Sequence, residues 1–169
     1  MNIFFLHHSP QIAALYHCDK HVVKMIVETA QLLATAHHQH GNGHAVTYKP
    51  THVNHPSAIW ARESRLHYAY LVDLGKSLCK QFRLRYGKQH SCYGLFFGEL
   101  ADVPPAMKDM PCKWRVPPQC MPDECKHEDV VVAYRNYYRW KKNVMTMVWY
   151  RNEGSYSPEF MSADSHATV

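Results

Sequence analysis

The chain has 169 residues and a mass of 19.7 kDa, a length that fits one domain with an ordinary core. Hydrophobic residues make up 46% of the sequence and charged residues 20%, proportions that exclude a disordered or collagen-like chain. The formal net charge is +5 and there are 14 histidines, so an anionic partner is favoured, although many proteins of this charge bind none.

No apolar run reaches the roughly 18 residues of a membrane span, and the first residues lack the basic region of a signal peptide. We therefore expect a cytoplasmic protein, located in the host cell if a phage encodes it, that does not contact a membrane. Its six cysteines are then expected to be reduced thiols. Cys112, Cys120 and Cys125 lack the CxxC spacing of a structural zinc site.

Three segments have the spacing of apolar residues that is typical of helices. The first runs from about residue 10 to about residue 38, with Ser9-Pro10 at its start, and a break near Cys18 would divide it. The second follows His55-Pro56 and ends before Gly87, and the third runs from about residue 123 to about residue 142. The expected apolar faces include Val23, Ile26 and Leu33, then Ile59, Leu66 and Leu74, then Tyr134, Tyr137 and Tyr138.

A long connection rich in proline, glycine and aromatic residues, from Ser91 to Pro122, precedes the third helix, and such loops are often functional. The expected fold class is mainly α, a compact single-domain bundle of three long helices with any strand confined to the first few residues. The helical domain is expected to cover residues 1–160, and the small polar residues 161–169 are expected to form a disordered tail.

Six polar residues share one face of the first expected helix, because they are three or four positions apart. Such a face is usually solvated, but here Glu28 lies one turn from Lys24 and two turns from His21. The Lys24–Glu28 pair is either an ordinary helical salt bridge or an acid/base pair in a cleft, where the carboxylate accepts a proton or stabilises positive charge. The six residues are His17, His21, Lys24, Glu28, Gln31 and Thr35.

Rings and cations alternate along the third expected helix, a pattern that suits stacking on bases combined with phosphate contacts. The alternative is that the rings belong to the core while the cations extend into solvent. Arg62 and Arg65 of the second expected helix would add phosphate contacts, and His55 stands at a helix start, where main-chain N–H groups bind phosphate. The expected nucleic-acid-binding residues of the third helix are Arg135, Tyr138, Arg139, Trp140 and Lys141.

Two further features of the sequence bear on binding sites. If a base is extruded from DNA, a pocket is required, and Trp114 and Arg115 of the connection are candidate walls. Histidines at positions 37, 38, 40 and 44 would bind zinc, nickel or copper in a fixed geometry, but glycines between them favour exposed side chains and no metal site. No cofactor is expected, since the P-loop, GxGxxG, GxSxG and HExxH motifs do not occur in the sequence.

The run from Cys18 to Glu28, CDKHVVKMIVE, resembles the first-helix segment of the phage-type pyrimidine-dimer DNA glycosylases, the endonuclease V family. Asp19, His21 and Glu28 match that family's acidic residue, histidine and catalytic glutamate. The resemblance implies a three-helix bundle that acts on duplex DNA with the base extruded. It also implies a primary amine at the N-terminus that attacks the sugar C1′ and forms a Schiff base, with the glutamate assisting.

Residue 2 departs from the family pattern, in which a small residue, usually Thr, is exposed by removal of the initiator methionine. Here it is Asn, whose side chain is expected to block that removal. The amine is therefore expected from Met1, or from Lys24 or Lys20, unless the lyase step has been lost.

With Glu28 as the carboxylate and His21 orienting the site, the sequence predicts a DNA glycosylase for a damaged or modified pyrimidine, with or without AP-lyase activity. Two alternatives stay open. One is an enzyme that acts on free or modified nucleotides in the same cleft, and the other is a non-enzymatic module that binds nucleic acid or a host protein.

Overall fold

The computed structural model describes residues 1–149, 151 and 156–162, and its fold is mainly α, as expected. These residues contain no strand, so the strand allowed for at the start of the chain is absent there. Short 3-10 turns lie at Gly43–Ala45, Pro105–Met107, Asp123–Cys125 and Glu159–Met161. The helices are α1 (Pro10–Tyr16), α2 (Asp19–Gln39), α3 (Pro56–Glu63), α4 (Arg65–Tyr86), α5 (Tyr93–Phe97) and α6 (Val130–Lys141).

The first expected helix is divided near Cys18, and this break was predicted. Ser9 caps α1 by accepting a hydrogen bond from the Ile12 N–H at 3.4 Å. His17 and Cys18 have extended backbones, with ψ of 132° and 162°, so α2 begins only at Asp19. The two helices therefore leave the break in different directions.

The second expected helix is also divided, and this break was not predicted. Ser64 is extended, with ψ of 144°, and its side chain caps α4 by accepting from the Leu66 N–H at 3.2 Å. The helical spacing of apolar residues continues through Ser64, so the sequence carries no sign of the boundary between α3 and α4. The ends of the segment are as expected, because His55 caps α3 and Gly87 ends α4 with a φ of 68°.

The third expected helix begins later than predicted. Asp129 is its N-cap, since its carboxylate accepts from the main-chain N–H groups of Val131 and Val132. Residues 123–125 form a separate 3-10 turn instead. Met161 is buried against the core, and residues 163–169, most of the expected tail, lie outside the described residues.

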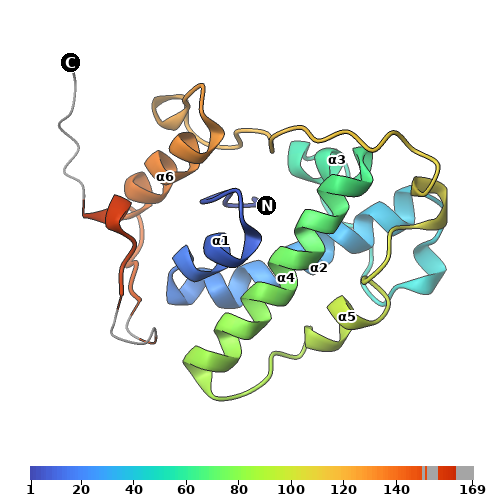
Figure 1. The fold of residues 1–169 in the computed structure, drawn as a ribbon, viewed down its shortest axis with the longest axis horizontal. Helices are drawn as coiled ribbons and strands as arrows, with labels where there is room; N and C mark the ends of the chain where they lie inside the picture. Colours follow the sequence, from blue (N-terminus) through green and yellow to red (C-terminus); the bar gives the residue numbers. More distant parts are fainter. Residues whose placement is uncertain (150, 152–155, 163–169) are drawn as a thin grey trace.

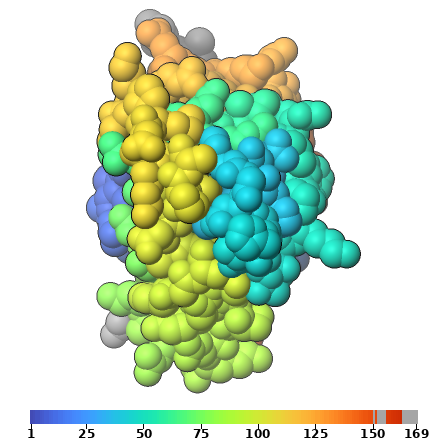
Figure 2. All heavy atoms as spheres, turned by 90° about the vertical axis from the view of Figure 1, so that its right-hand side faces the viewer, coloured from blue at the N-terminus to red at the C-terminus, as the bar shows by residue number. Residues whose placement is uncertain are grey.

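Helices α2 and α4 form the centre of the molecule, with α1 and α3 packed against them (Figure 1). Helix α6 lies on the side away from α5, next to the N-terminal segment. The connection crosses the surface beside the chain that follows α2 (yellow and cyan in Figure 2), where the Thr47 N–H donates to Glu99 at 2.7 Å. None of the described helices is long and apolar enough to cross a membrane.

The N-terminal segment is part of the core. Its residues from Ile3 to Leu6 are all buried, and the Arg135 side chain of α6 donates to the Leu6 carbonyl oxygen at 3.0 Å. Phe4 has a φ of 52°, a left-handed conformation that costs a non-glycine residue about 1–2 kcal/mol. The surrounding packing therefore holds the first residues in one defined position.

Three residues of the expected apolar faces are exposed instead. Val23 adjoins Lys24 on the outer side of α2. Ile59 is 36% exposed and Leu66 is 39% exposed. Because the break at Ser64 separates these two residues, the single apolar stripe drawn through both does not exist.

Candidate active site

The Glu28 carboxylate is bonded through both oxygens. Its Oε1 lies 3.2 Å from the Lys24 ammonium, and its Oε2 accepts from the Asn2 main-chain N–H at 3.2 Å. The Glu28 side chain is 14% exposed, whereas Lys24 is largely exposed. The ordinary salt bridge expected from the spacing is present, and the contact with residue 2 adds a long-range partner that the spacing did not reveal.

The N-terminal amine lies close to the Glu28 carboxylate. Because one residue spans at most about 3.6 Å, the Met1 nitrogen is no more than about 7 Å from Glu28 Oε2. The neighbouring His55 has its pKa lowered, first by burial and then by the positive N-terminus, while Glu28 opposes this shift. His55 also caps α3, because its Nδ1 accepts from the Ser57 N–H at 3.1 Å.

Lys141 reaches this site from α6. Its ammonium lies 5.0 Å from the centre of the Tyr137 ring and 5.7 Å from that of the Phe4 ring, within cation–π range. Burial lowers the pKa of Lys141, the nearby Lys24 lowers it further, and Glu28 raises it. We call the group made of Glu28, Lys24, Lys141, His55 and the N-terminal amine the Glu28 cluster.

Asn2 is a positioning residue that the sequence reasoning missed. Its Oδ1 accepts from the main-chain N–H groups of Ile3 at 2.7 Å and Phe4 at 3.1 Å, and its Nδ2 donates to the Cys120 carbonyl oxygen at 2.9 Å. These bonds stabilise the left-handed Phe4 and point the residue-2 N–H at Glu28. The available signal was that Asn side chains readily bond their own backbone in such turns. Strained residues held in this way are concentrated at functional sites.

His21 is buried behind the cluster rather than within it. Its ring stacks on Phe4 with centroids 4.5 Å apart, and its Nδ1 lies 2.8 Å from the Tyr138 hydroxyl. Burial is the main cause that lowers the pKa of His21 to about 3, so the ring is neutral at physiological pH. His21 therefore supports Phe4, which in turn packs beside Lys141.

Two other candidates on α2 lie away from the cluster. Asp19, the acidic residue of the family resemblance, forms a buried ion pair with Arg85 at 3.2 Å. Lys20 is exposed and lies eight residues before Glu28, about 12 Å along the helix. The structure thus brings Met1, Lys24 and Glu28 together and leaves Lys20 apart.

Most of the arginines expected to bind phosphate are bonded to the protein itself. Arg62, Arg135 and Arg139 donate to the main-chain carbonyls of Val53, Leu6 and Phe160, at 2.8, 3.0 and 3.0 Å. Arg65 begins α4, and its Nε is buried without a hydrogen-bond partner among the described residues. Arg62, Arg135 and Arg139 keep their charge and further N–H donors, but each is partly buried and held against its own chain.

The expectation that Tyr138 stacks on a base is wrong. Its side chain is fully buried, and its hydroxyl accepts from the Cys18 N–H at 3.0 Å. Tyr134 is buried as well, so the alternative that these rings form the core holds for both. Trp140 is half-buried and donates to Glu124 at 2.9 Å.

The histidines at the end of α2 bond to nearby groups. His37 is buried, contrary to expectation, with its Nε2 2.8 Å from the Tyr68 hydroxyl. His38 and His40 contact main-chain carbonyls at 2.9 and 3.1 Å. Across residues 1–149, 151 and 156–162, no three histidine, cysteine or acidic side chains gather as a metal would need. All six cysteines are free.

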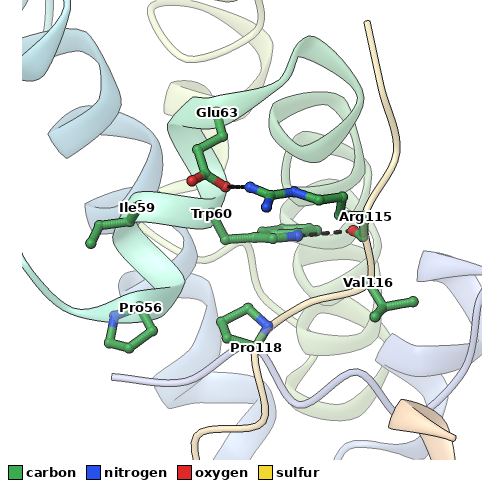
Figure 3. A pocket seen from close by; sticks show the side chains of 7 residues that line it. All are labelled: Pro56, Ile59, Trp60, Glu63, Arg115, Val116 and Pro118. Atoms are coloured by element: carbon green, nitrogen blue, oxygen red, sulfur yellow. Dashed lines mark hydrogen bonds and ion pairs between the residues drawn. The ribbon is translucent and has the colours of Figure 1, made fainter.

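A cavity of about 620 Å³, the α3 pocket, lies between α3 and the connection (Figure 3). Helix α3 supplies Pro56, Ile59, Trp60 and Glu63, and the connection supplies Arg115, Val116 and Pro118. Of the two candidate wall residues, Arg115 lines this pocket and Trp114 is not among its lining residues. Trp114 packs edge-on against Trp60 with centroids 5.7 Å apart.

Comparisons with protein-family models, with curated proteins and with solved structures found no match for this chain.

Proposed function

We propose that the protein is a DNA glycosylase that acts on a damaged or modified pyrimidine through an amine and Glu28. The supporting observation is the hydrogen bond from the Asn2 N–H to Glu28, because it brings the N-terminal amine beside a largely buried carboxylate. The same pairing of amine and glutamate is what the family resemblance implies.

In the proposed reaction the Met1 amine is the first candidate nucleophile. Its lone pair forms a bond to C1′ as the bond from C1′ to the base breaks, and the base leaves with the electron pair and takes up a proton. Glu28 accepts a proton from the nitrogen as it adds. Opening of the sugar ring, with a proton added to O4′, then leaves an iminium between protein and sugar.

The two lysines of the Glu28 cluster give the site a net positive charge around one carboxylate. In this proposal Lys24 and Lys141 would bind phosphates that flank the attacked sugar, because both ammonium groups lie in the cluster. Lys24 is also the second candidate nucleophile, since its ammonium already contacts Glu28. His21 acts only by positioning, through Phe4.

Borohydride trapping tests the proposal, since it reduces the iminium to a stable covalent bond. We expect the wild-type protein to be trapped on a duplex with an abasic site, and to release base from duplexes with an ultraviolet photoproduct or a modified pyrimidine. Glu28→Gln should lower both rates by at least about 100-fold, because it removes the proton acceptor. The matched control is Glu128→Gln, at an exposed residue outside the cluster, which should react like wild type.

Acetylation of the N-terminus separates the two nucleophiles, because it abolishes trapping if Met1 attacks and leaves it intact if Lys24 does. The absence of any adduct and of any base release by the wild-type protein would refute the glycosylase proposal.

A second candidate function is an enzyme that acts on free or modified nucleotides. The observation that favours it is that Arg62, Arg135 and Arg139 are partly buried and held to main-chain carbonyls of their own chain, so their side chains are less free to reach the phosphates of a duplex. This function predicts binding of a nucleotide together with little affinity for duplex DNA at about 0.15 M salt. If the protein is instead a non-enzymatic binding module, Glu28→Gln should leave its binding of nucleic acid or of a host protein unchanged.

A further inference from the structure

We infer that the α3 pocket receives the extruded base, an inference that rests on the proposed function. Its volume of about 620 Å³ falls within the range of about 300–1,000 Å³ of small-molecule sites. The walls formed by Ile59, Val116 and the proline rings are apolar. A base outside the duplex needs such surfaces for its flat faces, because it has lost its stacking partners.

The rim of the pocket carries groups that suit the polar edge of a base. Glu63 and Arg115 form an ion pair there (Figure 3), and both side chains are partly exposed. A carboxylate and a guanidinium in one pair still have unused acceptor and donor positions. Since the edge of a pyrimidine carries both N–H groups and carbonyl oxygens, Glu63 would accept from the former and Arg115 would donate to the latter.

The pocket wall is fixed before any ligand binds. The Trp60 indole donates to the Arg115 carbonyl oxygen at 2.9 Å, and its ring stacks on His67 with centroids 4.2 Å apart. His67 in turn accepts from the Arg115 N–H at 2.9 Å. These bonds attach the connection to α3 at the pocket, so a ligand meets a preformed surface.

The pocket shares its wall with the Glu28 cluster. Pro56 of the pocket follows His55 of the cluster directly, and the next residue, Ser57, lies 3.6 Å from the Cys120 sulfur. Cys120 lies only two residues beyond Pro118 of the pocket, and its carbonyl oxygen accepts from the Asn2 side chain. Two residues span at most about 7 Å, so the Pro118 edge of the pocket lies close to the segment that holds Asn2. We therefore infer that the sugar of a bound base lies on this side, towards the amine and Glu28.

The test fills the pocket and leaves the Glu28 cluster unchanged. Ile59→Trp and Val116→Trp place an indole in the pocket from two different segments, at residues that are already exposed. Leu66→Trp is the matched control, because Leu66 is as exposed as Ile59 but does not line the pocket. Circular dichroism verifies that each variant is folded. The two measurements are binding of thymidine 5′-monophosphate by calorimetry and borohydride trapping on an abasic-site duplex.

We expect both filling variants to weaken nucleotide binding at least about tenfold, and the control to stay within about twofold of wild type. Trapping on the abasic site should be unchanged in the Leu66→Trp control. In the two filling variants it should fall much less than nucleotide binding does, because that substrate has no base to place. The inference is wrong if wild type does not bind the nucleotide at millimolar concentrations, or if the filling variants bind it as wild type does. If wild type shows no trapping while the filling variants lose nucleotide binding, the glycosylase proposal fails and the pocket stands as a nucleotide site.

Discussion

The buried ion pair between Asp19 and Arg85 allows a quantitative prediction. The carboxylate side chain is 8% exposed and the guanidinium side chain 1% exposed. Arg85 also donates to the His17 carbonyl at 2.7 Å and the Leu15 carbonyl at 2.9 Å, so it joins α4 to the break between α1 and α2. Burial lowers the pKa of Arg85, and Asp19 is the main group that opposes this shift.

Replacing Asp19 by Asn keeps the shape of the side chain but leaves the buried guanidinium without its counter-charge. Losing one member of a buried pair costs about 3–5 kcal/mol. The lower end applies here, because the amide oxygen of Asn still accepts a hydrogen bond. A loss of about 3 kcal/mol lowers the melting temperature of a chain of this length by about 6–12 °C.

Thermal and urea unfolding of Asp19→Asn, followed by circular dichroism, measure this loss. The control is Asp123→Asn, which removes the same charge from a side chain that is 93% exposed and pairs with Lys126 at the surface. The control should show no measurable change of midpoint. Equal midpoints for the two variants would refute the reasoning, because the structural role of the Asp19 carboxylate depends on its burial.

Two further predictions concern stability. Burial lowers the pKa of His17 to about 4 and that of His21 to about 3, whereas both are near 6.5 when unfolded, so the unfolded chain binds more protons below pH 6.5. The free energy of unfolding is therefore highest above pH 6.5. It falls as the pH is lowered towards 4, by up to about 1.4 kcal/mol per pH unit for each histidine. Urea titrations between pH 4 and 8 measure this slope, and a flat profile would contradict the prediction. Gly75→Ala should destabilise the fold by about 1–3 kcal/mol, since a Cβ there would lie 2.1 Å from the Phe96 ring. Gly94→Ala is the control, because a Cβ at that position meets open space. Equal melting temperatures for the two variants would show that the contact between α4 and α5 adapts.

The helical part of the fold follows closely from the sequence. Apolar spacing predicted α2. The capping residues at Ser9-Pro10 and His55-Pro56 marked the starts of α1 and α3, and Gly87 marked the end of α4. The break at Ser64 was missed because the apolar spacing runs through it. The start of α6 was missed because Asp123 and Asp129 are equally good N-caps in the sequence, and only the second is used.

The candidate site follows from the sequence only in part. Lys24 and Glu28 are one helical turn apart, so their contact was predictable. The contacts of Asn2 with Cys120 and of Lys141 with the Phe4 ring join residues more than a hundred positions apart, and no local pattern encodes them. Tyr138 was misassigned for the same reason, since its hydroxyl bonds to Cys18, just before α2, and to His21 on α2.

The contacts of the N-terminal segment have a consequence for biosynthesis. Residues 2–6 leave the ribosome more than a hundred residues ahead of Cys120 and Arg135, to which they bond. At a translation rate of about 5–20 residues per second, the segment waits several seconds or longer for these partners. Helices α1, α2 and α4 can pair during that interval, but the bonds of Asn2 to Cys120 and of Leu6 to Arg135 are both in place only after α6 has been made. A nascent chain that ends before α6 therefore lacks the complete set of bonds, from Cys120 and Arg135, that holds its first residues in place.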